Sequence, residues 1–147
     1  MTDLTGALAN LRRIARKDPS AARLPTESEV REAENLMGRD FPQDYRRFLL
    51  ETGDVGFGTL EPATVITRDG WPRFLADMVV EAHTEGVRVD WLPIVEDNAD
   101  YYCLAPDGSV RFWSHSRKTN ESWPDLASWI EEVWIGEYLD RKSPYGG

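Results

Sequence analysis

Residues 91–115 read WLPIVEDNADYYCLAPDGSVRFWSH, and this stretch decides the fold because it holds three strand-like runs separated by turn residues. The runs cover residues 91–95, 101–105 and 110–113, and they are rich in the aromatic and β-branched residues typical of strands. Between the last two, Pro106 presets φ, Asp107 can bond its own backbone and Gly108 tolerates positive φ. The stretch therefore predicts a β-meander.

The other turn of the meander, residues 96–100, carries the three carboxylates Glu96, Asp97 and Asp100 at one end of the predicted sheet. A solvated turn is the simplest interpretation, and a partner-binding loop is the second. Oxygen ligands for Ca²⁺ or Mg²⁺ come third, because the run lacks the spacing and the glycine of an EF-hand loop.

The size and composition of the chain indicate one domain without covalent or metal staples. With 147 residues, a domain buries roughly 70% of its unfolded surface. Cys103 is the single cysteine, so no internal disulfide forms. The first residues lack the apolar run of a signal peptide, and no stretch approaches the ~20 apolar residues of a membrane span. We therefore expect a cytoplasmic protein that does not enter the membrane.

The charge of the chain is strongly negative and unevenly distributed. The net charge is -9, and residues 81–147, which include the meander, carry 13 acidic and 6 basic side chains. This balance argues against direct binding of nucleic acid, which relies on clustered Lys and Arg. The excess of carboxylates has two interpretations: it keeps the protein soluble, or it forms an anionic face for a basic partner.

Helical periodicity flanks the meander on both sides. Apolar residues at three- and four-residue spacing predict helices over residues 3–17, 26–37, 41–52 and 71–85, and from near Ser122 to 138. Thr26 and Glu29 have the spacing of a capping box, and Gly38 is placed to end the same helix. The stripe of this second helix is predicted to include Leu36, and the short link to the third helix predicts an antiparallel hairpin.

Extended structure is predicted in two further places. The glycine-rich residues 53–58 lack the Lys-Ser/Thr ending of a phosphate-binding loop, so we interpret them as a turn feeding a strand over residues 60–67. Val87, Val89 and Trp91 alternate into the meander. The chain is thus predicted to be one α+β domain over residues 1–147, with a mostly antiparallel sheet and about five helices.

The candidates for catalysis are few. His83 and His115 have no second His or Cys at metal-ligand spacing. Ser114 and His115 are adjacent in an extended run, so their side chains point to opposite faces of the sheet. Cys103 lies within an aromatic strand and is interpreted as a small buried hydrophobe. The sequence therefore predicts no catalytic residue, no metal and no cofactor.

Two stretches together form a recognisable pattern. The first is EAENLMGRDFPQDYRRFLLETGDVGFG, in which the positions that matter are Glu34, Leu36, Gly38, Phe41-Pro42, Tyr45, Phe48-Leu49 and Gly53. The second is the meander itself, with its Leu-Pro strand, tyrosine-rich strand and Asp-Gly turn. Together they resemble the SUKH superfamily, which includes fungal cell-wall assembly regulators and bacterial immunity proteins that neutralise polymorphic toxins. The chain departs from the pattern at Asn98-Ala99, where the family tends to carry Gly.

The resemblance implies a binding protein, not an enzyme, that presents a groove or face of its sheet to a cognate toxin domain, commonly a nuclease or deaminase. A toxin that acts on nucleic acid is basic near its substrate site, so an acidic partner can occupy that site. The predicted contact residues are Glu96, Asp97, Asp100 and the exposed members of Tyr101, Tyr102 and Trp113. The alternative is a regulatory or scaffolding domain that binds a host protein.

Overall fold

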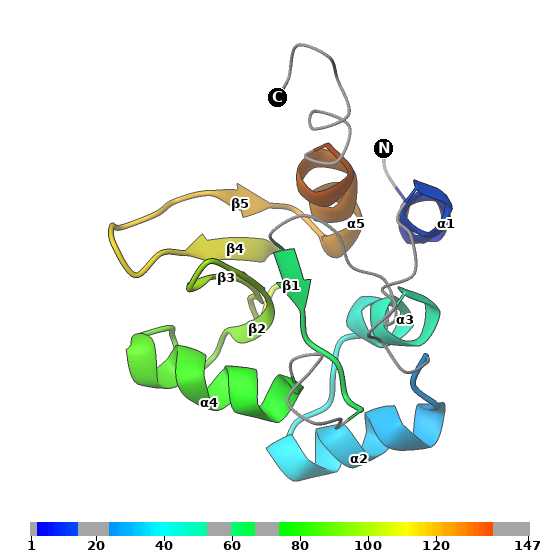
Figure 1. The fold of residues 1–147 in the computed structure, drawn as a ribbon, viewed down its shortest axis with the longest axis horizontal. Coiled ribbons are helices and arrows are strands. Elements are labelled where there is room, and N and C mark those ends of the chain that lie inside the picture. The colour runs from blue at the N-terminus through cyan, green and yellow to red at the C-terminus, as the bar shows by residue number, and fades with distance from the viewer. Residues whose placement is uncertain (1–2, 15–23, 53–59, 67–73, 137–147) are drawn as a thin grey trace.

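The computed structural model describes residues 3–14, 24–52, 60–66 and 74–136. These residues form a five-stranded sheet with helices around it (Figure 1), which confirms the predicted α+β class. The strands are β1 (Leu60–Pro62), β2 (Leu92–Asp97), β3 (Asp100–Leu104), β4 (Val110–Trp113) and β5 (Ser122–Trp123). The helices are α1 (Leu4–Ile14), α2 (Glu27–Met37), α3 (Gln43–Thr52), α4 (Leu75–Glu85) and α5 (Leu126–Trp129), which continues as the π-helix η1 (Ile130–Ile135).

The sheet is a meander whose strand order β1-β2-β3-β4-β5 follows the chain, and every neighbouring pair is antiparallel. The predicted strands become β2, β3 and β4 at its centre. Two predictions at the edges are wrong. The strand expected over residues 60–67 ends at Pro62, and Ser122 lies in β5, not at the start of the last helix, which begins at Leu126 with Asp125 as its N-cap.

The two tight turns of the meander differ in how well their residues suit the backbone conformation. Residues 96–100 do not form a long turn, because the β2–β3 ladder continues to the pair of Asp97 and Asp100. Asn98 and Ala99 alone make the turn, with φ of 52° and 74°. Positive φ at both central residues defines a type I′ turn, whose twist matches that of the flanking strands. In the β3–β4 turn, Gly108 has a φ of 89° and the Asp107 carboxylate accepts the backbone N–H of Ser109 at 3.0 Å, as predicted.

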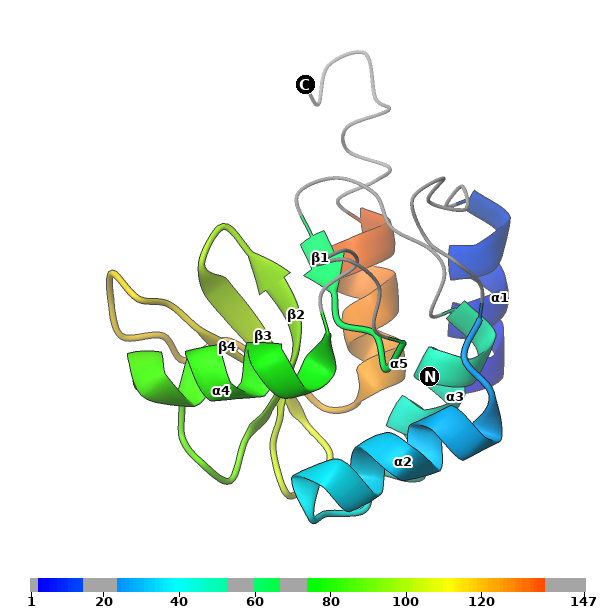
Figure 2. The same ribbon diagram turned by 60° about the horizontal axis from the view of Figure 1, so that its bottom comes forward.

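The sheet lies between two helical layers. Helix α4 packs on β2 and covers one face (Figure 2), while α5 and η1 approach the other face, where the Trp129 and Tyr102 rings lie 5.1 Å apart. Helix α1 packs against α3, α5 and η1 on the outside of that second layer. Apolar side chains of both layers and the sheet form one buried cluster.

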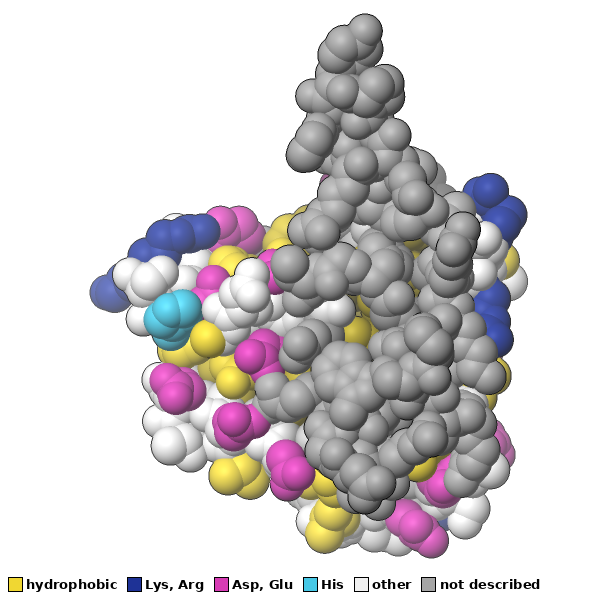
Figure 3. Space-filling model, viewed as in Figure 1, with side chains coloured by type: hydrophobic (Ala, Val, Ile, Leu, Met, Phe, Trp, Pro, Cys, Tyr) yellow, Lys and Arg dark blue, Asp and Glu magenta, His cyan; other side chains and the backbone are white. Residues whose placement is uncertain are grey.

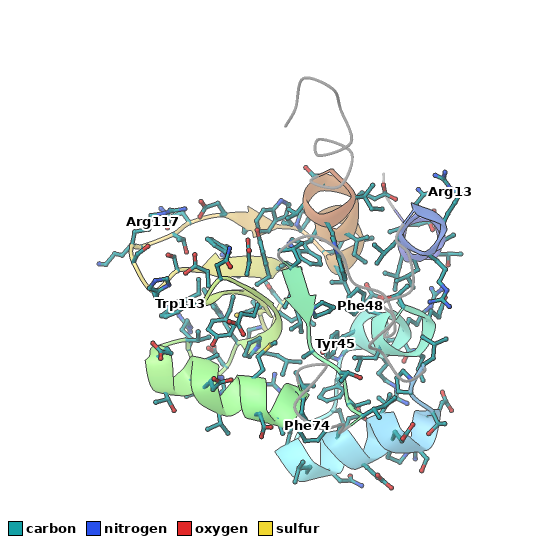
Figure 4. The ribbon with its side chains drawn as sticks, in the orientation of Figure 1. Arg13, Tyr45, Phe48, Phe74, Trp113 and Arg117 are labelled. Carbon is teal, nitrogen blue, oxygen red and sulfur yellow. The ribbon has the colours of Figure 1, made fainter. Side chains whose placement is uncertain are left out.

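A chain of aromatic rings runs through this core. Tyr45 and Phe48 point from α3 toward the middle of the molecule (Figure 4), and Phe48 contacts Trp134 of η1 at a centroid distance of 5.9 Å. Trp134 contacts Trp129, which contacts Tyr102 of β3. The predicted burial of Phe48 and Trp129 is confirmed, because their side chains are 1% and 0% exposed.

Helix α2 is capped as predicted but faces the core differently. Thr26 and Glu29 form the capping box, and Gly38 takes the left-handed conformation that ends the helix. Leu36, predicted for the buried stripe, is 66% exposed, and Glu34 is buried instead. Helix α2 runs across the view in Figure 1 while α3 is seen nearly end-on, so the two helices cross and the predicted antiparallel hairpin is wrong.

The segment before β2 also departs from the prediction. Residues 87–91 form turns, not an alternating strand, and Val89 is 78% exposed. The predicted extension of the first helix to residue 17, the glycine-rich turn at 53–58, the helix start at Trp71 and the stripe residue Tyr138 lie outside the described residues. Among the helices that are described, none has the length and apolarity needed to cross a membrane.

Candidate partner-binding surface

The predicted contact residues gather around the β2–β3 hairpin tip, which we define as residues 96–100. The register pairs Asp97 with Asp100 and Glu96 with Tyr101, so all three predicted carboxylates lie within two residues of the turn. Glu96, Asp97 and Asp100 are each partly exposed. The two-residue turn therefore concentrates negative charge at one end of the sheet.

Strand alternation divides the predicted residues between the two faces of the sheet. Cross-strand partners share a face, so Glu96, Tyr101 and Trp113 belong to the face covered by α4. The Trp113 ring reaches the end of that helix, where a Cβ on Gly86 would lie 3.6 Å from it. Asp97, Asp100 and Tyr102 belong to the opposite face. Only a partner that approaches the tip end-on reaches both groups.

The aromatic residues differ in what they can offer a partner. Tyr101 is 4% exposed and packs against Trp113 at a ring-centroid distance of 6.0 Å, so it is a buried contact of the Trp113 ring and offers a partner little surface. Trp113 is partly exposed at the edge of the core. Tyr102 is also partly exposed, but its ring is held by Phe112, Trp123 and Trp129. Trp113 is therefore partly exposed with one described ring contact, to Tyr101, whereas the partly exposed Tyr102 is held by three rings.

The carboxylate of Asp100 is committed to a structural contact that the sequence pattern does not reveal. Its Oδ1 accepts the backbone N–H of His115 at 3.1 Å and lies 2.7 Å from the His115 ring Nδ1. This pair ties the end of β4 to the hairpin tip. The spacing of fifteen residues between them becomes meaningful only once the register of β3 and β4 is known.

Asp97 is held much more loosely than Asp100. Its carboxylate accepts a contact from the side-chain amide of Asn98 at 3.5 Å, which is at the outer limit of a hydrogen bond. A partly exposed carboxylate with so weak a contact can accept hydrogen bonds from a binding partner. Asp97 is therefore the carboxylate of the tip that is best placed to bind a cationic group.

Ser114, His115 and Cys103, which were considered as nucleophiles, bases or metal ligands, make structural contacts or are buried. The Ser114 hydroxyl pairs with the Ser116 hydroxyl at 3.0 Å, and His115 turns to Asp100. Cys103 is fully buried, and burial raises the pKa of its thiol well above the usual range, which disfavours the reactive thiolate. Within the described ranges no three His, Cys, Asp or Glu side chains cluster as metal ligands would. The arrangement at the tip suits recognition by charge and by an aromatic ring.

The described part of the surface in Figure 3 is rich in carboxylates. Asp and Glu side chains are spread over it, while Lys and Arg lie mainly at two opposite margins. Figure 4 places Arg117 at one margin, on the same side of the molecule as Trp113, and Arg13 at the other. This view of the molecule thus offers carboxylates to a basic partner and has a basic margin near Trp113.

Comparison with known proteins places the chain in a family. A search of curated proteins finds no match. A solved crystal structure of a protein from Pseudomonas syringae pv. tomato is 32% identical, with a TM-score of 0.80 over 90% of this chain and 98% of the other. The family model SUKH_5, described as SMI1-KNR4 cell-wall, matches residues 5–135. Since that match spans α1 through η1, the chain belongs to the SUKH superfamily.

Proposed function

We propose that this protein is an immunity protein that binds a cognate toxin domain in the cytoplasm and blocks it. The toxin is a nuclease or another enzyme that acts on nucleic acid, and it is basic around its substrate site. The protein uses the β2–β3 hairpin tip in place of the phosphates that such a site binds.

The observation that carries this proposal is the partly exposed negative charge at the hairpin tip. Glu96 and Asp97 end β2 next to the type I′ turn on opposite faces, and Trp113 lies two strands away on the face of Glu96. Interfaces combine a few aromatic or Arg contacts that supply affinity with charges that guide the encounter. Trp113 and the two carboxylates are one such combination.

Identification of the partner is the first step of the test. A gene immediately upstream that encodes a secreted multidomain protein with a variable C-terminal domain supplies the candidate toxin domain. We expect co-expression of that domain with this protein to protect cells from it. If such a gene is absent and no toxin domain is bound, the protein serves instead as a regulatory or scaffolding domain.

Kinetics of association then test the site. Neutralising the tip with Glu96→Gln and Asp97→Asn is expected to lower the association rate about three- to tenfold at low salt, because steering by charge acts mainly on this rate. The variant should also lose most of the salt dependence, since exposed charges are screened beyond a Debye length of about 8 Å at physiological salt.

The matched control removes the same charge elsewhere. Glu32 on α2 and Glu132 on η1 are both exposed, and Glu32→Gln with Glu132→Gln should leave the association rate and its salt dependence close to those of the wild type. Equal effects of the two double variants would mean that only net charge matters and that the partner docks away from the tip.

A further inference from the structure

A groove with a volume of about 700 Å³ lies away from the hairpin tip, between the end of α2 and the outer side of α4. Its walls include Leu36 from α2, Val80 from α4 and Val89 from the turn that precedes β2. Figure 2 shows α2 and α4 on the outside of the molecule. The groove is thus open to a macromolecular partner.

The exposed apolar residues of the described chain coincide in this groove. Leu36 and Val80 are 66% exposed and Val89 is 78% exposed, and these are the large hydrophobic side chains that the structure describes as exposed. Single exposed apolar residues are common, but a contiguous group marks an interaction site. Their convergence on one groove from three segments is such a group.

Helix α4 shows the same feature in its own pattern. Its core stripe is Leu75, Met78 and Ala82, all of them buried. Ala76, Val79, Val80 and His83 line the groove at spacings of three, four and seven residues, and Val79 also packs against the core. The apolar surface of α4 thus extends past its core stripe to Ala76 and Val80, and this extension is the part that a partner can bury.

The charges at the groove balance. The charged Arg and Asp residues of the lining are Arg39, Asp77 and Asp90. Arg88, which lies outside the lining, pairs with Asp90 at 2.9 Å and balances its charge, so Arg39 and Asp77 are left as one opposite pair. The pKa of Asp90 is held below its usual range chiefly by the hydrogen bond from Arg88, and also by the charge of Arg39. The groove is thus locally neutral on a chain whose net charge is -9.

The local neutrality of the groove indicates which kind of partner it binds. A basic partner gains no steering here, whereas it gains much at the hairpin tip. A second copy of this chain is repelled by most of the acidic surface, and a neutral apolar groove lets it approach. Arg39 and Asp77 form no ion pair with another described residue, and they stand on opposite walls, so a twofold axis can pair each with the other in the partner.

We propose that this groove is the interface of a symmetric homodimer, in which α4 of one protomer packs on α4 and the end of α2 of its partner. Contacts of this kind are isologous, so each copy buries the same apolar group. The hairpin tip stays outside the interface, because none of its residues lines the groove. The dimer can therefore present one tip per protomer.

The test is the molar mass of the full chain, measured by sedimentation equilibrium from low to high micromolar concentration without any toxin. We expect the wild type to form a dimer. Val80→Asp should weaken it about tenfold or more, because it places a charge in the centre of an apolar contact. Leu36→Ser is the milder second variant, and its exposed site tolerates the change without loss of the fold.

The control variant Ala9→Asp adds the same charge to an exposed position on α1 and should dimerise like the wild type. Circular dichroism confirms that each variant is folded. The proposal is overturned by a wild type that is monomeric at every concentration, by a dimer that survives both groove variants, or by a dimer that Ala9→Asp disrupts equally. Because no toxin is present, these outcomes are independent of the proposed function.

Discussion

At the scale of single residues, Ala99 is the described position where the side chain suits the backbone conformation least. Its φ of 74° lies in the left-handed region, which costs a residue with a Cβ roughly 1–2 kcal/mol and costs glycine nothing. Type I′ turns prefer Asn-Gly for this reason, and this turn has Asn98-Ala99. The strain therefore sits at the tip that we propose binds the partner.

We predict that Ala99→Gly stabilises the protein by about 1 kcal/mol, because it relieves the left-handed strain. Urea denaturation followed by circular dichroism measures the change. The same substitution in an exposed helix, Ala9→Gly in α1, should destabilise by about 0.5–1 kcal/mol. A loss of stability at both positions would contradict the left-handed assignment at Ala99.

At the scale of elements, one buried carboxylate joins α2 to α3. Glu34 receives Arg46 Nη1 on one oxygen at 2.5 Å and the backbone N–H of Phe41 on the other at 2.7 Å. Its side chain is 9% exposed and that of Arg46 is 16% exposed. The resemblance to the SUKH pattern included this Glu, and the structure supplies its physical reason: it orients the start of α3 against α2.

We predict that Glu34→Ala destabilises the protein by roughly 2–4 kcal/mol, because it leaves the Arg46 charge and the Phe41 N–H without a partner. Glu32→Ala removes an exposed carboxylate from the same helix and should change the free energy of unfolding by less than about 0.5 kcal/mol. Denaturant titrations of both variants measure the difference. Equal effects would show that the contact contributes nothing beyond helix charge.

At the scale of the whole molecule, a chain of aromatic rings joins α3, η1 and α5 to strand β3 of the sheet. Its members in the helices, Tyr45, Phe48, Trp129 and Trp134, are all buried. Phe48 and Trp129 each contact the Trp134 ring at a centroid distance of 5.9 Å. We predict that Phe48→Ala or Trp129→Ala costs about 3–5 kcal/mol, which approaches the total stability of an ordinary domain. Thermal unfolding measures it, and a loss below about 1 kcal/mol at both positions would rule out this core.

The sequence by itself determined the features that depend on neighbours along the chain. The central strands, the capping box of Thr26 and Glu29, the cap at Gly38 and the turn at Asp107-Gly108 are all present as predicted. Each depends on backbone conformation or on hydrogen bonds within a few residues, and such preferences act before any tertiary contact forms. The position of Glu96, Asp97 and Asp100 at one end of the sheet was likewise predictable, because they flank a local turn.

Only the tertiary structure decided which of these residues are buried and which face one another. Periodicity placed Leu36 in a buried stripe, but α3 crosses α2 and engages Glu34, so Leu36 is left exposed in the groove. The same holds for the division of Asp97 and Glu96 between faces, and for the contact of Asp100 with His115. Whether a side chain is buried depends on which other helix or strand packs against it, and the periodicity of one segment does not identify that neighbour. For this reason the location of the hairpin tip could be predicted from the sequence, whereas the groove between α2 and α4 could not.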